Sequence, residues 1–192
     1  MRNPIRLKNL SARFLPFYLI GGAVLFWRPP QEEGLVLALP LILAGALLRG
    51  WGAGHLVKNA QLTTTGPYAH LRHPLYLGTI MVATGFAIWV GGWMTGIMLA
   101  FVWPWFAFRY FPRKDRVESQ RLEAAYGERF RRYRSEIPAL WPRWRRWRPP
   151  NVDEAQGSWS LDRYSENNEL GTLLALCFGI VLFGWRSAAV FG

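Results

Sequence analysis

Long apolar runs alternate along this chain with polar, mostly basic stretches. The apolar runs cover residues 14–27, 34–57, 75–108 and 170–185. The third run has no charged side chain, and as one helix it would extend about 50 Å, well beyond a hydrocarbon core of about 30 Å. We therefore expect it to form a hairpin that turns at Gly91-Gly92. With this hairpin, the pattern predicts five membrane helices.

A different periodicity follows the hairpin. Leu122, Tyr126, Phe130 and Tyr133 recur at the spacing of one helix face, with arginines around them. They predict a cytoplasmic amphipathic helix of about 18 residues, in which Glu118 lies one turn before Leu122. Residues 151–169 are polar and indicate a loop before the last helix. The predicted fold is a single all-α integral membrane domain over residues 1–192.

Charge gives the orientation of this domain. The chain carries a net charge of +11, with basic residues at the ends of the apolar runs. This placement favours contact with the lipid bilayer over binding to nucleic acid. The segment before residue 14 is basic, and residues 113–148 hold twelve Lys and Arg. The positive-inside rule therefore predicts a cytoplasmic N-terminus, and the excess of Arg over Lys favours a bacterial inner membrane.

The first apolar run, at residues 14–27, follows basic residues as a signal peptide does. No cleavage site with small residues follows it, so we interpret it as a retained helix.

Chemically distinctive residues are concentrated in the segment GPYAHLRHPLYLG at residues 66–78. Pro74 is placed to begin a helix, because the first helical position needs no N–H. Arg72 and His73 then lie at the start of the helix, where free N–H groups attract a carboxylate. Simple anchoring of a helix end by lipid headgroups is the alternative. Anchoring selects charge and aromaticity, however, and does not select an ordered series of His, Pro, Tyr and Gly.

This segment resembles the signature of the isoprenylcysteine carboxyl methyltransferase family, which is related to the membrane phospholipid methyltransferases. In that family Gly-Pro-Tyr and Arg-His-Pro-x-Tyr-x-Gly precede a membrane hairpin, and a Glu-rich helix with Phe-Gly-x-x-Tyr-x-x-Tyr follows it. This chain has Glu118, then Tyr126-Gly127-Glu128-Arg129-Phe130-Arg131-Arg132-Tyr133, then Pro138 and Pro142. The resemblance covers residues 62–142, the expected catalytic core.

The resemblance implies S-adenosylmethionine as cofactor, bound at the cytoplasmic face. It assigns two groups of residues to the cofactor pocket: Gly66, Pro67, Tyr68, His73, Pro74, Tyr76 and Gly78 from the first motif, and Tyr126, Arg129 and Tyr133 from the second. Arg72 and Glu118 would face the reacting centre as catalytic residues.

The chain departs from the family pattern in two places. Glu118-Ser119 replaces the usual pair of acids, and residues 151–192 add a loop and a further membrane helix.

The expected function is methyl transfer to a lipophilic or amphiphilic acceptor. Arg72 would hold a carboxylate acceptor, whereas Glu118 would act as the base for an amine, and the sequence does not decide between the two. Two alternatives are an NADPH-dependent membrane reductase of the sterol-reductase type and a non-catalytic membrane scaffold. His55, His70 and His73 lack further ligands at metal spacing, so we expect no metal. The sequence indicates no oligomeric state.

Overall fold

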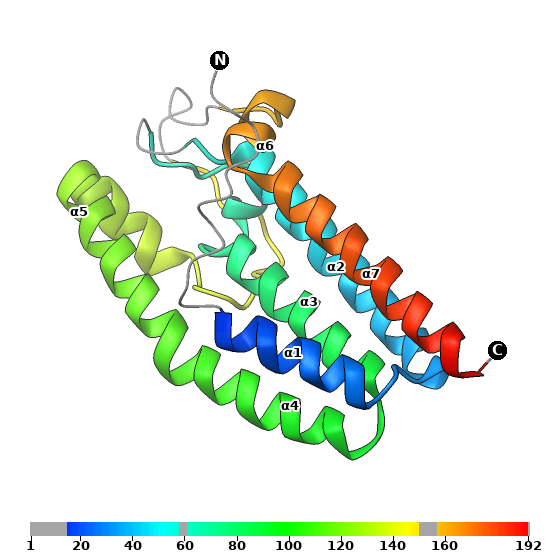
Figure 1. The fold of residues 1–192 in the computed structure, drawn as a ribbon. Helices are drawn as coiled ribbons and strands as arrows, with labels where there is room; N and C mark the ends of the chain where they lie inside the picture. Colours follow the sequence, from blue (N-terminus) through cyan, green and yellow to red (C-terminus); the bar gives the residue numbers. More distant parts are fainter. Residues whose placement is uncertain (1–14, 58–60, 150–156, 192) are drawn as a thin grey trace.

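A computed structural model describes residues 15–57, 61–149 and 157–191, and these residues form helices and connecting loops without a strand. Figure 1 shows the helices packed side by side, with α5 extending away from the bundle. The all-helical prediction is thus confirmed for the described part of the chain. In order, the elements are α1 (Leu15–Trp27), α2 (Glu32–His55), the 3-10 helix η3 (Gly66–Ala69), α3 (Pro74–Val90), α4 (Gly92–Pro104), the π-helix η4 (Trp105–Tyr110), α5 (Phe111–Glu136), α6 (Leu161–Glu166) and α7 (Glu169–Phe191).

Two of these helices, α2 and α7, are long and apolar enough to cross a membrane by length and composition. Helix α3 is a shorter apolar helix of 17 residues, and α1 and α4 have 13 residues each. The structure therefore supports two of the five predicted membrane helices by this criterion. The other three correspond to predicted apolar runs but fall short of the required length.

The predicted hairpin is present, and it turns where the glycine pair indicates. Helix α3 ends at Val90, α4 begins at Gly92, and the Gly91 N–H donates to the Ile88 carbonyl. Gly91 and Gly92 have φ angles of 78° and 58°. Only glycine adopts this region readily, so the pair allows the two helices to fold back within two residues.

Close packing joins α2 to α3, because glycines on both helices let the backbones approach. A Cβ at Gly45 would lie 2.7 Å from the Gly78 carbonyl oxygen, and one at Gly78 would lie 2.6 Å from the Gly45 carbonyl oxygen. Small residues of this kind bring membrane helices together through van der Waals contact. Gly78 therefore contributes to the helix interface.

Helix α5 differs from the predicted helix of about 18 residues. Its 26 residues consist of two helical parts joined across a kink, and it continues from α4 through η4. Pro112 lies in the first turn of α5, a position that proline favours. The π-helical segment η4 precedes it, so the helical backbone continues from α4 into α5 without a loop. A kink at Gly127, with φ 51° and ψ −126°, divides the helix.

The C-terminal region also differs from the prediction. Residues 151–169 were expected to form a loop, but residues 161–166 form helix α6. Asn167 fixes the end of α6 to α2 by donating two hydrogen bonds, to the carbonyls of Ala53 and Leu56. Helix α7 then runs beside α2 (Figure 1). Such tertiary contacts stabilise a helix too short to form alone.

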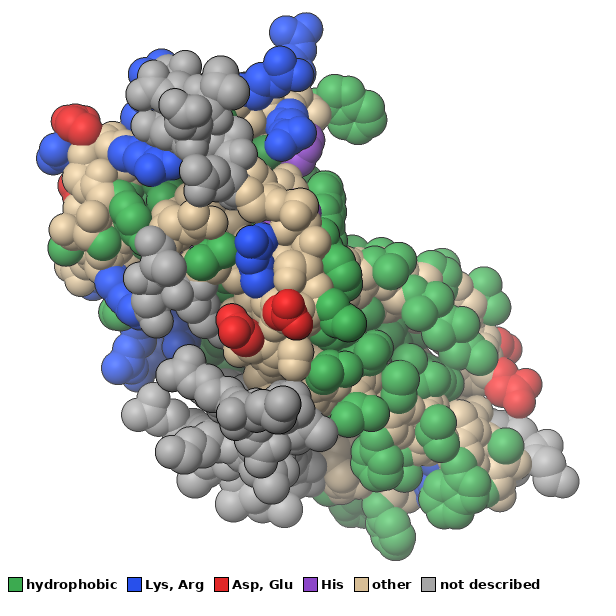
Figure 2. Space-filling model, turned by 90° about the horizontal axis from the view of Figure 1, so that it is seen from above, with side chains coloured by type: hydrophobic (Ala, Val, Ile, Leu, Met, Phe, Trp, Pro, Cys, Tyr) green, Lys and Arg blue, Asp and Glu red, His purple; other side chains and the backbone are tan. Residues whose placement is uncertain are grey.

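Charge is unevenly distributed over the molecule. Figure 2 shows Lys and Arg side chains gathered toward one end and hydrophobic side chains exposed over the opposite half. The exposed hydrophobic residues on α2, α4 and α7 include Leu37, Phe101 and Phe178. This separation fits a protein whose apolar half is surrounded by lipid. The basic residues before residue 14 lie outside the described residues, so the cytoplasmic orientation of the N-terminus stays a prediction.

Candidate active site

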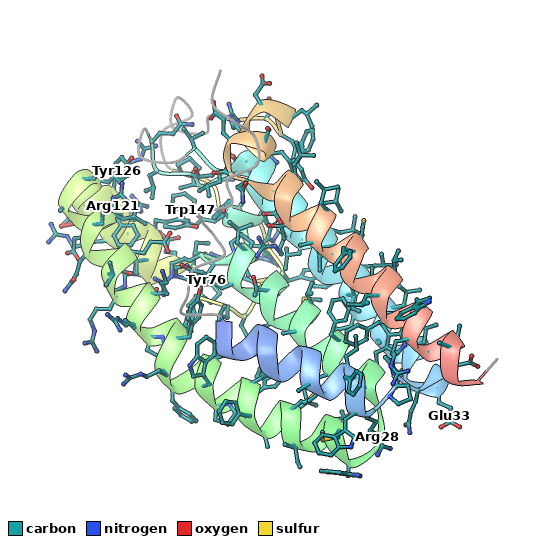
Figure 3. All side chains as sticks on the ribbon, in the orientation of Figure 1. Arg28, Glu33, Tyr76, Arg121, Tyr126 and Trp147 are labelled. Atoms are coloured by element: carbon teal, nitrogen blue, oxygen red, sulfur yellow. The ribbon has the colours of Figure 1, made fainter. Side chains whose placement is uncertain are left out.

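A cavity of about 410 Å³ lies between the start of α3 and helix α5. Its volume is typical of a small-molecule site. Tyr76 on α3 and Tyr126 on α5 approach it from two sides (Figure 3). The lining residues are aromatic, charged and aliphatic: Tyr68, Arg72, His73, Tyr76, Lys114, Val117, Glu118, Ser119, Arg121, Leu122, Ala125, Tyr126, Phe130 and Tyr133, together with residues 56–57 and 61–63.

The local sequence explains how the first motif reaches this cavity. Gly66, with a φ of 59°, is the first residue of the short 3-10 helix η3. The Tyr68 N–H donates to the Thr65 carbonyl and closes the first turn. Pro74 occupies the first turn of α3, as predicted, and His73 is at the N-cap position, where its side chain makes no capping hydrogen bond. The side chains of Arg72 and His73 thus project from the point where the chain enters the helix.

Backbone hydrogen bonds hold this point against the segment after α5. The Arg72 N–H donates to the Pro138 carbonyl at 2.9 Å, and the His73 N–H donates to the Ala139 carbonyl at 3.0 Å. The Tyr133 hydroxyl donates to the Tyr68 carbonyl at 2.7 Å. Because these bonds satisfy buried polar groups on both segments, the two motifs are fixed relative to each other.

Asp115 forms the charged centre of the site. One oxygen, Oδ1, lies 2.7 Å from His73 Nε2, 3.2 Å from Arg72 Nη1 and 3.4 Å from Ser119 Oγ. Partial burial acts to raise the pKa of Asp115, but the His73 hydrogen bond and the Arg72 charge outweigh it and hold the pKa below its usual value. Asp115 is therefore ionised at neutral pH.

His73 lies between two carboxylates. Burial lowers its pKa, against the opposing effects of Asp115 and Glu118, so the imidazole is neutral at pH 7. With an ionised Asp115 near Nε2, the proton of the neutral ring is assigned to Nε2. The other nitrogen, Nδ1, then carries a lone pair 3.8 Å from Glu118 Oε2.

Glu118 is the most accessible acid of this group, with 45% of its side chain exposed. The Tyr76 hydroxyl donates to Glu118 Oε2 at a long distance of 3.4 Å. The two residues lie on different walls of the cavity, since Tyr76 belongs to α3 and Glu118 to α5. A carboxylate in this position faces any molecule that enters.

Aromatic rings surround these polar groups. The His73 ring stacks on Tyr76 at 5.4 Å and meets the edge of Phe111 at 5.3 Å. Burial also raises the pKa of the Tyr68 and Tyr133 hydroxyls, so both stay neutral over the physiological range. Neutral aromatic faces attract a cation without carrying a full charge themselves.

Most of the residues that the sequence assigned to the site line the cavity: Tyr68, Arg72, His73, Tyr76, Glu118, Tyr126 and Tyr133. Five assigned residues do not contribute to its wall: Gly66, Pro67, Pro74, Gly78 and Arg129. Pro67 and Pro74 are fully buried and shape the turn, whereas Gly78 packs against α2. Their cofactor contacts remain predictions.

Asp115 was missed by the sequence analysis, which noted only that one carboxylate was lacking after Glu118. The signal was its position three residues before Glu118, because residues at i and i+3 share one face of a helix. Arg49, an arginine within the second apolar run, forms an ion pair with Glu169 on α7. That partner was not predicted.

Comparison with known proteins supports the resemblance. The family model for phospholipid methyltransferases matches residues 35–129. A protein-S-isoprenylcysteine O-methyltransferase of Schizosaccharomyces pombe is 26% identical over 137 residues, which are 69% of this chain and 56% of that protein. The cobalt-zinc-cadmium resistance protein CzcN of Cupriavidus metallidurans is 35% identical over 86 residues, which are 45% of this chain and 38% of that protein.

These matches have a limited extent. The chain spans about half or less of the length of the two curated relatives. The family match runs from α2 to the kinked part of α5, so α6 and α7 lie beyond it. No solved structure matches.

Proposed function

We propose that this chain is a member of the phospholipid methyltransferase family, whose model matches residues 35–129, and that it transfers a methyl group from S-adenosylmethionine to an amphiphilic acceptor. One observation carries the proposal: an aromatic cavity lined by Arg72, His73 and Glu118, in which Asp115 holds the Arg72 and His73 side chains by hydrogen bonds. This arrangement combines groups that can bind a cation, bind a carboxylate and accept a proton. A scaffold protein that binds no ligand would not require these groups in one cavity.

The residues fit the cofactor in shape and charge. A cavity of about 410 Å³ admits one nucleoside-sized ligand. Lys114 and Arg121 line it and suit the carboxylate of an amino acid. The aromatic faces of Tyr76 and Tyr126 suit a flat base or a sulfonium. When bound, S-adenosylmethionine supplies an electrophilic methyl group on positively charged sulfur.

The protein's task in such a reaction is mainly to position the reactants and exclude water. Orientation of two reactants supplies about 7–11 kcal/mol of the barrier reduction. The hydrogen bonds that lock residues 72–73 to residues 138–139 make the wall rigid enough for this role. The rings of Tyr76 and Phe111 pack against His73 and keep water away from its imidazole.

The geometry favours an amine over a carboxylate as the acceptor. Arg72 donates from Nε to the Ile137 carbonyl and from Nη1 to Asp115, so two of its donor nitrogens already bond to the protein and not to an acceptor. A carboxylate acceptor would also approach the negative charge of Glu118. An amine instead finds in Glu118 an accessible base for the proton that it loses.

The same proposal includes the location of the reaction. We propose that the five apolar helices lie in the membrane, with the shorter α1, α3 and α4 completing the bundle around α2. The Arg-rich helix α5 then lies at the cytoplasmic face. The cavity opens at this level, where the headgroups of amphiphilic acceptors lie.

Calorimetry on the purified full chain tests the cofactor. We expect binding heat with S-adenosylmethionine and none with NADPH. Heat with NADPH alone would instead favour the reductase alternative, and absence of both would favour a scaffold. Incubation with a lipid extract and cofactor labelled in the methyl group then identifies the acceptor, and the amine proposal fails if the label enters a methyl ester.

A further inference from the structure

Residues 139–148, which we call the Trp-Arg segment, form an irregular stretch after α5 with the sequence ALWPRWRRWR. Trp141 is 82% exposed and Trp144 is 98% exposed. Arg145 and Arg146 beside them are exposed as well. Trp147, by contrast, is buried in the core cluster with Phe130 and Tyr133. The segment is therefore anchored at one tryptophan and presents two others outward with cationic neighbours.

Exposed tryptophans beside arginines are suited to a surface where an apolar region borders a polar one. Tryptophan is enriched at the boundary between hydrocarbon and water, where its ring is buried and its N–H stays near the headgroups. Arginines in the same place attract anionic lipids. The Trp-Arg segment has both features and lies next to the start of α3, the cytoplasmic end of that helix in the proposed topology.

The backbone of the segment is joined to the active site. The Arg143 N–H donates to the His70 carbonyl, and the Trp147 N–H donates to the Ala69 carbonyl, both at 2.9 Å. In the reverse direction, the N–H groups of Arg72 and His73 donate to Pro138 and Ala139. Four backbone hydrogen bonds thus connect residues 69–73 with residues 138–147.

A side-chain contact strengthens this connection. The Trp147 indole N–H donates to Glu136 Oε2 at 2.9 Å, and Arg143 Nη1 donates to the Glu136 carbonyl at 3.1 Å. The Trp-Arg segment is therefore bonded to the last turn of α5 as well as to residues 69–73.

We propose that the Trp-Arg segment is a docking surface for anionic lipid headgroups of the same membrane, and that docking tightens the backbone around Arg72 and His73. The two exposed tryptophans enter the interface, and Arg145 and Arg146 bind lipid phosphates. The four backbone hydrogen bonds transmit the ordering to the cavity. The inference depends on membrane insertion but not on methyl transfer.

Lipid titration of the full chain in detergent tests the docking surface, with bound lipid counted by native mass spectrometry. We expect phosphatidylglycerol to bind more tightly than phosphatidylcholine. Arg145→Gln with Arg146→Gln should weaken phosphatidylglycerol binding by about thirtyfold, since each basic residue near an anionic surface contributes about fivefold. Arg131→Gln with Arg134→Gln, which removes the same charge from exposed positions on α5, should have little effect.

Three results would overturn the docking proposal: equal affinity of the wild type for the two lipids, equal loss in the two double variants, or displacement of the lipid by homopolymeric RNA at equal phosphate concentration. Trp144→Ala adds an independent check, because so exposed a side chain makes no folding contribution. It should reduce retention of phosphatidylglycerol, and unchanged retention would also contradict the proposal.

Hydrogen exchange in nanodiscs tests the connection to the cavity. The amides of Arg72, His73, Arg143 and Trp147 should exchange several-fold more slowly in phosphatidylglycerol than in phosphatidylcholine. The difference should vanish in the Arg145→Gln, Arg146→Gln variant. Unchanged exchange in a wild type that still prefers phosphatidylglycerol would disprove the ordering while leaving both the docking surface and methyl transfer intact.

Discussion

His73 Nε2 lies 2.7 Å from Asp115 Oδ1, and this contact joins the residue before α3 to the second turn of α5. The same Asp115 oxygen accepts from Arg72 Nη1. Two neighbouring residues of the first motif are therefore oriented by one carboxylate of the second helix. In the proposed reaction Asp115 positions His73 and Arg72 and need not touch the acceptor.

Asp115→Asn tests this positioning role. The amide keeps the size of the side chain but removes the charge that stabilises Arg72 and holds the His73 proton on Nε2. We expect a fall of tenfold or more in turnover with labelled acceptor, on the order of what oriented partners of a catalytic group contribute. The pKa of His73 should decrease further, which NMR of the labelled imidazole measures.

The matched control is Asp162→Asn, which removes an exposed carboxylate on α6. It should leave turnover and the His73 titration unchanged. If both variants lost activity equally, the effect would be one of overall charge and Asp115 would have no special role.

Stability should depend on pH through His73. Its pKa in the folded protein lies below 6.5, the ordinary value for histidine, so the unfolded chain binds the proton more readily. Stability is therefore fully present above about pH 6.5 and decreases as the pH falls toward the folded pKa. The pKa of Asp115 is lowered from 3.8, so its contribution is lost only at more acidic pH.

Thermal unfolding in detergent between pH 7.5 and 5.5 measures this dependence. The unfolding temperature should fall with pH in the wild type, and the fall should be shallower in His73→Gln, whose amide donates from a similar place without titrating. An equally steep fall in the variant would assign the pH dependence to other groups.

Glu118→Gln separates the two acceptor chemistries. With an amine acceptor, loss of the base should reduce turnover by about a hundredfold or more. Cofactor affinity, measured by calorimetry, should change much less. Glu123→Gln is the control on the same helix, because Glu123 forms an ion pair with Arg131 at the surface. Equal activities of the two variants would make Glu118 an ordinary surface acid.

The sequence predicted features whose signals are local. The apolar runs, the turn at Gly91-Gly92, the first-turn Pro74 and the apolar face of α5 each depend on residues within a few turns of one another. Hydrophobic periodicity and backbone preference are properties of such short stretches. The helices at these runs, the turn, Pro74 and the apolar face were accordingly confirmed, whereas only α2 and α7 are long and apolar enough to cross a membrane.

Features that depend on contacts between distant segments were missed. Asp115 gains its role from His73, which is 42 residues away in the chain. Helix α6 has only six residues and is held by α2, where the Gly50 carbonyl accepts from Trp159 and other carbonyls accept from Asn167. Neither the contact of Asp115 with His73 nor that of α6 with α2 produces a repeating pattern of residues that a single sequence would show.

Gly127 within α5 gives a prediction about the shape of the site. Its φ of 51° and ψ of −126° lie where side chains are strained, so Gly127→Ala should cost about 1–3 kcal/mol of unfolding free energy. The kink separates Tyr126 from the buried Phe130 and Tyr133, so cofactor affinity should weaken as well. Thermal unfolding and calorimetry measure the two effects.

Gly96→Ala is the control for this substitution. Gly96 lies in α4, a Cβ added there would meet no atom within 4 Å, and its φ is not among the positive values found at other glycines. Alanine there should leave stability unchanged or slightly higher. A similar loss in both variants would show that the backbone at Gly127 is not strained by a side chain.

The contact between Arg49 and Glu169 joins α2 to α7 beside the start of α3. Nε and Nη2 of Arg49 lie 2.7 and 2.8 Å from the two oxygens of Glu169, and Nη1 donates to the Leu75 carbonyl. Both side chains are largely buried, so removal of one charge leaves the other uncompensated. Glu169→Gln should therefore destabilise the protein by about 3–5 kcal/mol.

Replacing both partners distinguishes charge compensation from simple packing. Arg49→Met combined with Glu169→Leu removes both buried charges and keeps apolar volume, so its unfolding temperature in detergent should return toward that of the wild type. The double variant should also retain cofactor binding, because neither residue lines the cavity. A double variant as unstable as Glu169→Gln alone would mean that the hydrogen bonds from Arg49 to α3 hold the helices, and that α7 contributes little to them.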